Sequence, residues 1–274
     1  MKKTLGLFFA LCLVLPAQAY ELSDDIDTAN KTANVVELRQ LASATFALGK
    51  QWEIGVCEDI REVVYNSGAT PSAYFSKSYT SVEAGWKFFS YTDTYNNYKY
   101  SLKLNAGYTL RYLHPKQALR HRPYVSLSGS ANFGPVKLTL RERFLADCRT
   151  DSVNVLEQPK CAMELRHRLT ASFRIPGKTY RPFTFIELAN TLNQPSCFNT
   201  SGVRLYGGQY LCAVRAKVGI EWKISAQHAL IFSYGYHFSQ SREVNITRKS
   251  QEINRLYMEQ THRHVISVAY EFGM

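Results

Sequence analysis

The chain has no run of about 20 apolar residues, which a membrane-spanning helix needs. Its longest apolar stretch, Leu5–Leu15, is too short for that role. Cysteine is sparse, with 6 residues, and their spacing lacks the Cys-x-x-Cys character of a zinc site. We therefore expect no helical membrane anchor, no metal site and no cofactor.

The first residues resemble a secretory signal peptide. Lys2 and Lys3 form a positive segment, Leu5–Leu15 an apolar segment, and Ala17-Gln18-Ala19 a small-x-small cleavage site. We expect residues 1–19 to be removed, residues 20–33 to form an acidic N-terminal arm, and residues 34–274 to form one domain. Cys12 lacks the preceding small residues of a lipoprotein signal.

The chain is basic, with 33 Lys and Arg against 22 Asp and Glu. Removing Lys2 and Lys3 lowers the formal net charge from +11 to +9. Such a balance raises the question of nucleic acid. The charges are spread along the chain instead of clustered, and export removes nucleic acid as the usual partner, so we expect none.

Residues Glu164–Ile175 alternate between polar and apolar side chains almost without interruption. Successive side chains of a strand point to opposite faces, so this pattern predicts a strand with one polar and one apolar face. Eleven such segments follow one another from Asn34 to Phe272. In the longest, Tyr100–Tyr112, tyrosines bracket the apolar face, as a lipid-facing band with interfacial girdles requires.

The expected connections alternate in length. They are short after Leu48, Phe133, Ile175 and Ile224, and long after Tyr65, Tyr112, Ala146, Leu192 and Gln240. The pattern predicts an all-β protein, a transmembrane antiparallel up-and-down β-barrel of 10 to 12 strands in a Gram-negative outer membrane. Short turns would be periplasmic and longer loops extracellular. Since single-chain bacterial barrels have even strand numbers, we expect 10 or 12.

Two residues disturb the alternation, because Glu142 and His167 both fall on the apolar face of their segments. For Glu142 we expect a β-bulge or a local change of register.

The polar faces carry a candidate lumenal site. If the apolar faces meet lipid, a set of cationic side chains points inward: Arg141, Arg143, Arg166, Arg168, Arg174, Arg215, Lys217 and Lys223. Glu164, Glu187, Glu221 and Asp147 are the available partners. Two interpretations remain open: a passage that attracts anions, and a lumen filled by an Arg-carboxylate network.

Two other groups of residues are candidates. His237 and Ser239 share one strand face, as a base and a nucleophile would in a lipid-modifying hydrolase, and the outer-membrane phospholipase has a similar His-x-Ser arrangement. No orienting Asn or Asp lies nearby in sequence. A basic loop with Lys116, Arg120, His121 and Arg122 would meet lipopolysaccharide phosphates, or simply solvent.

The cysteines suggest a disulfide framework, since an exported chain can form disulfides. Cys148 and Cys161 close a short loop between two predicted strands, and Cys197 and Cys212 flank another. We expect these two pairs, with Cys57 as the odd thiol.

Several short motifs occur in order: Leu-Arg-Glu-Arg-Phe at 140–144, Leu-Arg-His-Arg-Leu at 165–169, Pro182-Phe183 followed by Glu187, and a closing aromatic strand. Together they resemble the exported proteins catalogued as domain of unknown function 2490. The resemblance implies an outer-membrane β-barrel and no defined activity. The last strand also resembles the signal read by the barrel-assembly machinery, although Gly273 and Met274 follow its final aromatic.

A soluble periplasmic β protein is the remaining alternative. It would explain the signal peptide and the disulfides but not the tyrosine-bracketed apolar faces. The sequence carries no indication of oligomeric state.

Overall fold

The protein is described by a computed structural model, which covers residues 28–68, 73–96, 98–152, 158–198, 204–246 and 253–273. The expected signal peptide and residues 20–27 of the expected arm lie outside the described residues. Within the described ranges no helix is long and apolar enough to cross a membrane.

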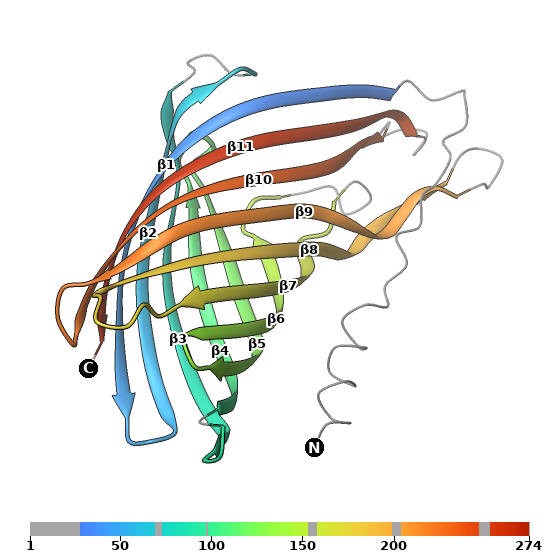
Figure 1. The fold of residues 1–274 in the computed structure, drawn as a ribbon. Helices are drawn as coiled ribbons and strands as arrows, with labels where there is room; N and C mark the ends of the chain where they lie inside the picture. Colours follow the sequence, from blue (N-terminus) through green and yellow to red (C-terminus); the bar gives the residue numbers. More distant parts are fainter. Residues whose placement is uncertain are drawn as a thin grey trace.

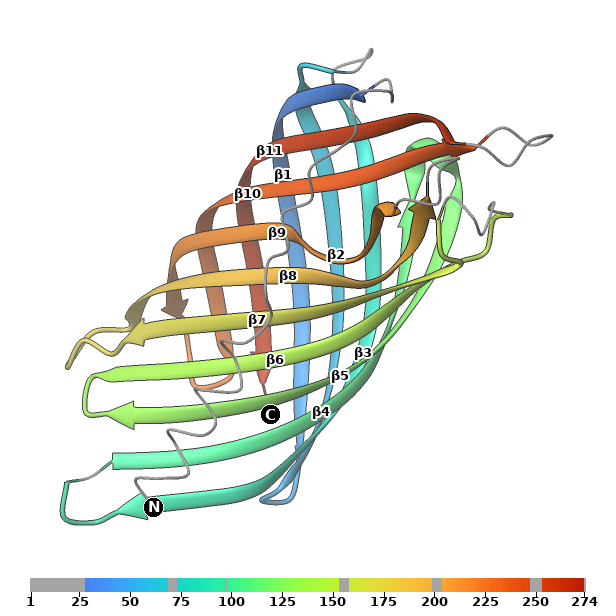
Figure 2. The same cartoon turned by 90° about the vertical axis from the view of Figure 1, so that its right-hand side faces the viewer.

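Eleven strands form one closed barrel, in which each strand pairs with its neighbours along the chain (Figure 1, Figure 2). They are β1 (Thr28–Leu48), β2 (Trp52–Asn66), β3 (Tyr74–Asp93), β4 (Tyr98–Leu113), β5 (Ala118–Phe133), β6 (Val136–Arg149), β7 (Cys161–Phe173), β8 (Tyr180–Phe198), β9 (Arg204–Lys223), β10 (His228–Ile246) and β11 (Ile253–Gly273). The all-β barrel expected from the alternation is confirmed.

The barrel closes through a parallel pair. All sequential neighbours are antiparallel, but β1 runs parallel to β11, from Thr28 opposite Leu256 to Thr45 opposite Gly273. With an odd number of up-and-down strands, the first and last run in the same direction, so their pairing has to be parallel. The expectation of 10 or 12 strands is therefore wrong, and each of the eleven alternating segments is one strand.

Turns at one end of the barrel are tight. Gly49, Gly134 and Gly177 have positive φ values of 75°, 61° and 72° in the turns after β1, β5 and β7. Glycine adopts this left-handed conformation without the steric cost of a Cβ. We call this end of the barrel the short-turn end, and the opposite end the long-connection end.

Several strands extend farther than expected. β1 begins at Thr28, inside the expected arm, and β8, β9, β10 and β11 continue into the expected loops after Leu192 and Gln240. The connection after β4 consists only of residues 114–117, with His114–Lys116 as a short 3-10 turn (η1), so Arg120–Arg122 belongs to β5. Backbone pairing continues beyond the apolar band, where outward side chains need not be apolar and the alternation no longer marks the strand.

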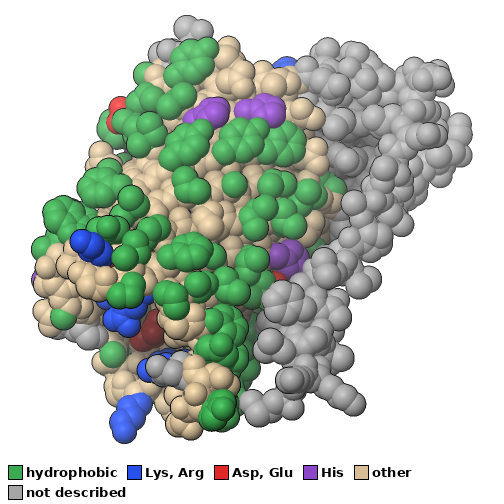
Figure 3. All heavy atoms as spheres, viewed as in Figure 1, with side chains coloured by type: hydrophobic (Ala, Val, Ile, Leu, Met, Phe, Trp, Pro, Cys, Tyr) green, Lys and Arg blue, Asp and Glu red, His purple; other side chains and the backbone are tan. Residues whose placement is uncertain are grey.

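The polarity of the barrel is inverted relative to a water-soluble protein. Outward apolar side chains are exposed, for example Val218 at 55% and Ile266 at 50%, whereas Glu37 and Glu187 are buried at 0% and 1%. Figure 3 shows hydrophobic side chains distributed over the outer face. Charge is therefore enclosed, and hydrocarbon faces outward.

Aromatic rings gather on the outer face near both ends. At the short-turn end Trp52 stacks on Trp86 with ring centroids 5.7 Å apart, and Phe46 meets Phe272 at 6.4 Å. Toward the long-connection end Tyr112 packs edge-on against His114 at 4.9 Å. These two groups occupy the places where interfacial girdles lie in membrane barrels.

The two residues that disturb the alternation face each other. Glu142 and His167 are direct partners on β6 and β7, and their side chains form an ion pair on the outer face. The register of this strand pair is continuous, so the bulge expected at Glu142 is wrong. Pairing a carboxylate with an imidazole lowers the cost of placing both on an apolar surface.

One of the two expected disulfides is present. Cys148 and Cys161 are bonded across the ends of β6 and β7. The pair Cys197–Cys212 is wrong, because Cys212 is a free thiol that donates to the carbonyl of Ala189 at 3.2 Å, while Cys197 lies opposite Tyr206 farther along the strands. Cys57 is free, as expected.

Candidate functional site in the barrel lumen

The expected inward cations lie on lumenal positions of three strands, with Arg141 and Arg143 on β6, Arg166 and Arg168 on β7, and Arg215, Lys217 and Lys223 on β9. Arg174 is the exception. β7 ends at Phe173, so Arg174 lies in the following turn, where it is exposed and its backbone N–H donates to the carbonyl of Pro135 at 2.6 Å. The expectation of a lumenal Arg174 is wrong.

Glu187 on β8 is the centre of one lumenal cluster. Arg168 contacts its carboxylate at 2.6 Å and Arg141 at 3.5 Å, and Arg215 forms a third ion pair with it. These cations come from β7, β6 and β9, so one carboxylate links four strands. The Arg168 guanidinium also lies 4.3 Å above the Phe185 ring.

A second cluster is built around Glu83 on β3. Arg143 contacts this carboxylate at 3.2 Å, and the Tyr124 hydroxyl donates to it at 2.8 Å. The Arg143 guanidinium lies 4.0 Å above the Tyr124 ring. These contacts connect β3, β5 and β6 across the lumen.

The position of Tyr124 depends on a glycine. A Cβ at Gly107 on β4 would lie 2.4 Å from the Tyr124 ring and hydroxyl, so any larger residue would displace the ring. Gly219 has the same relation to Phe183, at 2.6 Å. These glycines make room for rings that fill the lumen.

A third cluster lies where the barrel closes. Glu37 on β1 meets Arg263 of β11 at 3.1 Å, Arg61 of β2 at 3.4 Å and Lys77 of β3 at 3.7 Å. Asp59 pairs with Arg61 and with Arg39, each at 2.8 Å. None of these residues was among the candidates from sequence, although Glu37, Asp59 and Arg61 occupy the polar faces of their segments.

The fourth cluster includes two residues of the expected basic loop. Arg120 and Arg122 are lumenal residues of β5, and together with Arg111 of β4 they surround Asp147 of β6. Their distances to Asp147 Oδ2 are 2.9 Å for Arg111, 3.4 Å for Arg122 and 3.8 Å for Arg120. Of the expected loop residues, His121 points outward and contacts Tyr108, and only Lys116 lies in the connection.

Three of the four clusters, those around Glu187, Glu37 and Asp147, contain more cations than carboxylates, whereas Glu83 is matched by Arg143 alone among the described ion pairs. Glu187 and Asp147 each face three arginines. Within the described ranges no group of three or more His, Cys, Asp and Glu side chains is arranged to hold a metal ion. The described contacts of these arginines are electrostatic, with guanidinium groups directed at carboxylates.

The pair His237 and Ser239 lies on the lumenal face of β10. The His237 ring leans over Gly235, where its Nε2 would lie 3.2 Å from an added Cβ, and so it points away from Ser239. In register His237 is opposite Arg263 and Arg215. No hydrogen bond joins His237 to Ser239 among the described contacts, and no carboxylate orients the ring, so the arrangement needed for nucleophilic catalysis has no structural support.

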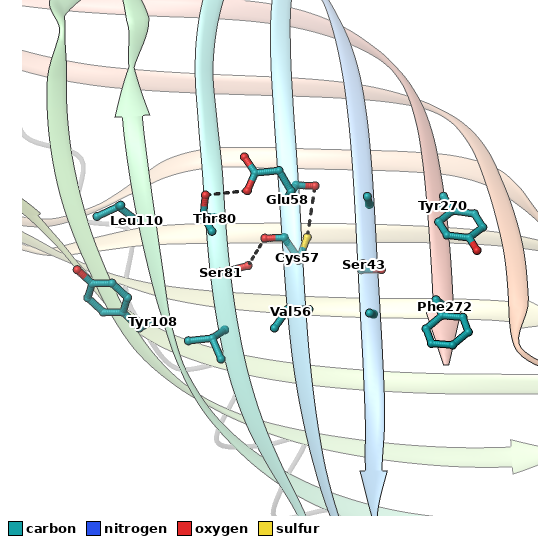
Figure 4. A pocket seen from close by; sticks show the side chains of 13 residues that line it. Ser43, Val56, Cys57, Glu58, Thr80, Ser81, Tyr108, Leu110, Tyr270 and Phe272 are labelled. Carbon is teal, nitrogen blue, oxygen red and sulfur yellow. Dashed lines mark hydrogen bonds between the residues drawn. The ribbon is translucent and has the colours of Figure 1, made fainter. Parts of the chain in front are cut away.

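A groove of about 670 Å³ lies on the outer face over β1 to β4 and β11. Figure 4 shows Tyr270 and Phe272 on one side of it and Tyr108 and Leu110 on the other. Glu58 lies between them and accepts a hydrogen bond from Thr80 at 2.7 Å. The groove arises because the outward residues of β1 at this level are small alanines, Ala42 and Ala44.

No family model and no curated protein matches this chain.

Proposed function

We propose that this protein is an integral β-barrel of the Gram-negative outer membrane, exported by residues 1–19. The inverted polarity of the barrel is the observation that carries the proposal. Exposed apolar surface costs roughly 25 cal/mol per Å² in water, and a bilayer removes that cost. A soluble periplasmic protein would instead bury Val218 and Ile266 and expose Glu37 and Glu187.

The orientation follows from the two ends. We propose that the short-turn end faces the periplasm and the long-connection end faces outward, toward lipopolysaccharide. The resemblance to the family of domain of unknown function 2490 agrees with this location, and the final aromatic strand agrees with insertion by the barrel-assembly machinery.

We further propose that side-chain ion pairs cross-link the strands through the lumen and leave no open channel. The Glu187, Glu83 and Glu37 clusters link strands that are not neighbours, as when Arg143 of β6 reaches Glu83 of β3. Rings of Tyr124 and Phe183 fill space between them. The role of the network is then structural, holding together a narrow barrel whose lumen is polar.

An anion-selective passage is the second candidate, favoured by the excess of arginine around Glu187 and Asp147. Planar-bilayer recording of the purified barrel separates the two. If the side-chain network fills the lumen, the barrel should show no steady conductance. A stable conductance whose reversal potential follows the chloride gradient would contradict this and support the anion-selective passage.

Cell fractionation tests the location itself. The protein should be recovered with the outer membrane and should migrate faster on gels before heating than after. Release with the periplasmic contents, without heat-modifiable mobility, would contradict the proposal.

A further inference from the structure

The geometry points to a binding site for a phosphate group in the lumen at Arg111, Arg120 and Arg122. This inference requires the closed barrel and is independent of the membrane location. The ligand class is inorganic phosphate or a phosphate monoester.

The first step is the charge of the cluster. Three guanidinium groups face the single carboxylate of Asp147, which leaves a local charge of +2. In register Arg120 lies directly opposite Arg111 on one side and Arg149 on the other. Like charges placed directly opposite each other destabilise a sheet, so negative charge beyond that of Asp147 and the nearby Asp151 would stabilise this arrangement.

The second step is the unused hydrogen-bonding capacity. All three arginines approach the same oxygen of Asp147, Oδ2, and among the described residues Oδ1 has no hydrogen-bond partner. The Nε atoms of Arg111 and Arg120 are also buried without a hydrogen-bond partner in this part of the structure, and Arg122 Nε has only its 3.4 Å ion-pair contact with Asp147 Oδ2. An unsatisfied buried donor costs about 1 to 3 kcal/mol, so an anion that these guanidinium groups turn to meet would recover that cost.

The third step is access. Arg111 lies two residues from the end of β4, Arg120 two residues from the start of β5, and Asp147 two residues from the end of β6. The cluster therefore lies just inside the long-connection end, and its arginine side chains remain 12% to 19% exposed. A solute that enters from that end would not have to cross the lumen to meet it.

The fourth step is the class of ligand. A phosphate presents several oxygens and carries between one and two negative charges near pH 7, which matches the charge of +2. Arginine binds such groups through paired N–H donors. Glu164, the carboxylate of the neighbouring strand, is held by Arg166 at 2.6 Å, and it also attracts Arg122 electrostatically without forming an ion pair with it among the described contacts.

Titration calorimetry of the full chain folded in detergent tests the site, with inorganic phosphate and glycerol phosphate as probes. Arg122→Gln should weaken binding about tenfold to hundredfold, the effect of losing a charged hydrogen bond. The matched control is Arg181→Gln, a lumenal arginine at the short-turn end that pairs with Glu221, and it should leave the affinity within about twofold of the original.

Asp147→Asn distinguishes the site from a merely structural cluster. Removing the competing carboxylate should tighten phosphate binding about tenfold, whereas a structural role predicts weaker binding or none. Heat-modifiable mobility checks the folding of each variant, and Arg120→Gln replaces Arg122→Gln if the latter does not fold. Absence of phosphate binding, equal affinity in Arg122→Gln and the original chain, or weaker binding in Asp147→Asn would overturn the inference.

A competition arm identifies the source of the phosphate. Phosphorylated lipid A that displaces inorganic phosphate assigns the site to lipopolysaccharide, and failure to displace it assigns the site to a soluble phosphate monoester. Dephosphorylated lipid A is the control for the acyl chains.

Discussion

Replacing Glu187 by Gln tests the role of the lumenal network most sharply. The substitution keeps the size of the side chain but removes the charge that Arg141, Arg168 and Arg215 share. Glu187 is 1% exposed, so the three cations would remain in a poorly solvated interior without their carboxylate. Breaking a buried ion pair by removing one partner costs about 3 to 5 kcal/mol, and we expect the free energy of unfolding to fall by that amount.

The matched control is Glu221→Gln. Its partner Arg181 is 3.8 Å away, and the two side chains are 26% and 30% exposed. A partly exposed pair at this distance contributes at most about 1 kcal/mol, so the control should be nearly neutral. Urea unfolding of the detergent-folded barrel, followed by tryptophan fluorescence and by gel mobility, measures both variants.

A double variant separates charge from packing. Glu187→Gln combined with Arg215→Gln removes one of the three cations that have lost their carboxylate, and it should recover part of the lost stability. If the double variant is less stable than Glu187→Gln alone, or if Glu187→Gln unfolds within about 1 kcal/mol of the original chain, the electrostatic reasoning is refuted.

Three further predictions concern single features. Gly107→Ala should lower the free energy of unfolding by about 1 to 3 kcal/mol, because a Cβ there displaces Tyr124. Gly55→Ala, whose Cβ would meet nothing closer than 3.9 Å, should be tolerated in the same urea assay. Equal losses of stability in the two variants would show that Gly107 does not make room for the Tyr124 ring. Replacing both Cys148 and Cys161 by Ser should remove about 3 kcal/mol and abolish the mobility difference between reduced and non-reduced samples, and a persisting difference would point to another disulfide. The double variant Glu142→Leu with His167→Leu should leave the stability of the barrel in lipid vesicles unchanged or raise it, whereas Glu142→Leu alone should lower it. Identical stabilities of the single and the double variant would show that the two side chains are not coupled.

The alternation of side chains predicts the strands and their faces because lipid and lumen impose opposite polarity on successive residues. That rule places Arg141, Arg166 and Glu187 inward and identifies all eleven strands. It also isolates Glu142 and His167 as exceptions, although only the register shows that each compensates the other.

The closure could not be predicted in the same way. Pairing of β1 with β11 joins the two ends of the chain, and no local pattern specifies whether such a pair is parallel. The general preference for even strand numbers led to the wrong count. The disulfide expected at Cys212 failed for a related reason. β8 and β9 continue their pairing into the expected loop, so Cys212 lies at the level of Ala189 and Asn190, whereas Cys197 lies farther along β8, opposite Tyr206.

The composition of each ion cluster also depends on the stagger of the strands. The polar faces identify Arg111, Arg122 and Asp147 as lumenal once their strands are known, but not as neighbours. Sequence alone placed Arg120 and Arg122 in a loop because basic residues near a turn resemble a solvated connection. Their position inside the barrel is the basis of the proposed phosphate site.

Quenching of tryptophan fluorescence tests the membrane location most directly. All 3 tryptophans of the chain, Trp52, Trp86 and Trp222, are on the outer face near the short-turn end, and they are 51%, 38% and 49% exposed. In vesicles, brominated lipids should quench them strongly, more so with bromine near the headgroup than near the bilayer centre, and aqueous iodide should quench them weakly. Strong quenching by iodide with none by brominated lipid would contradict a barrel whose apolar face meets the bilayer.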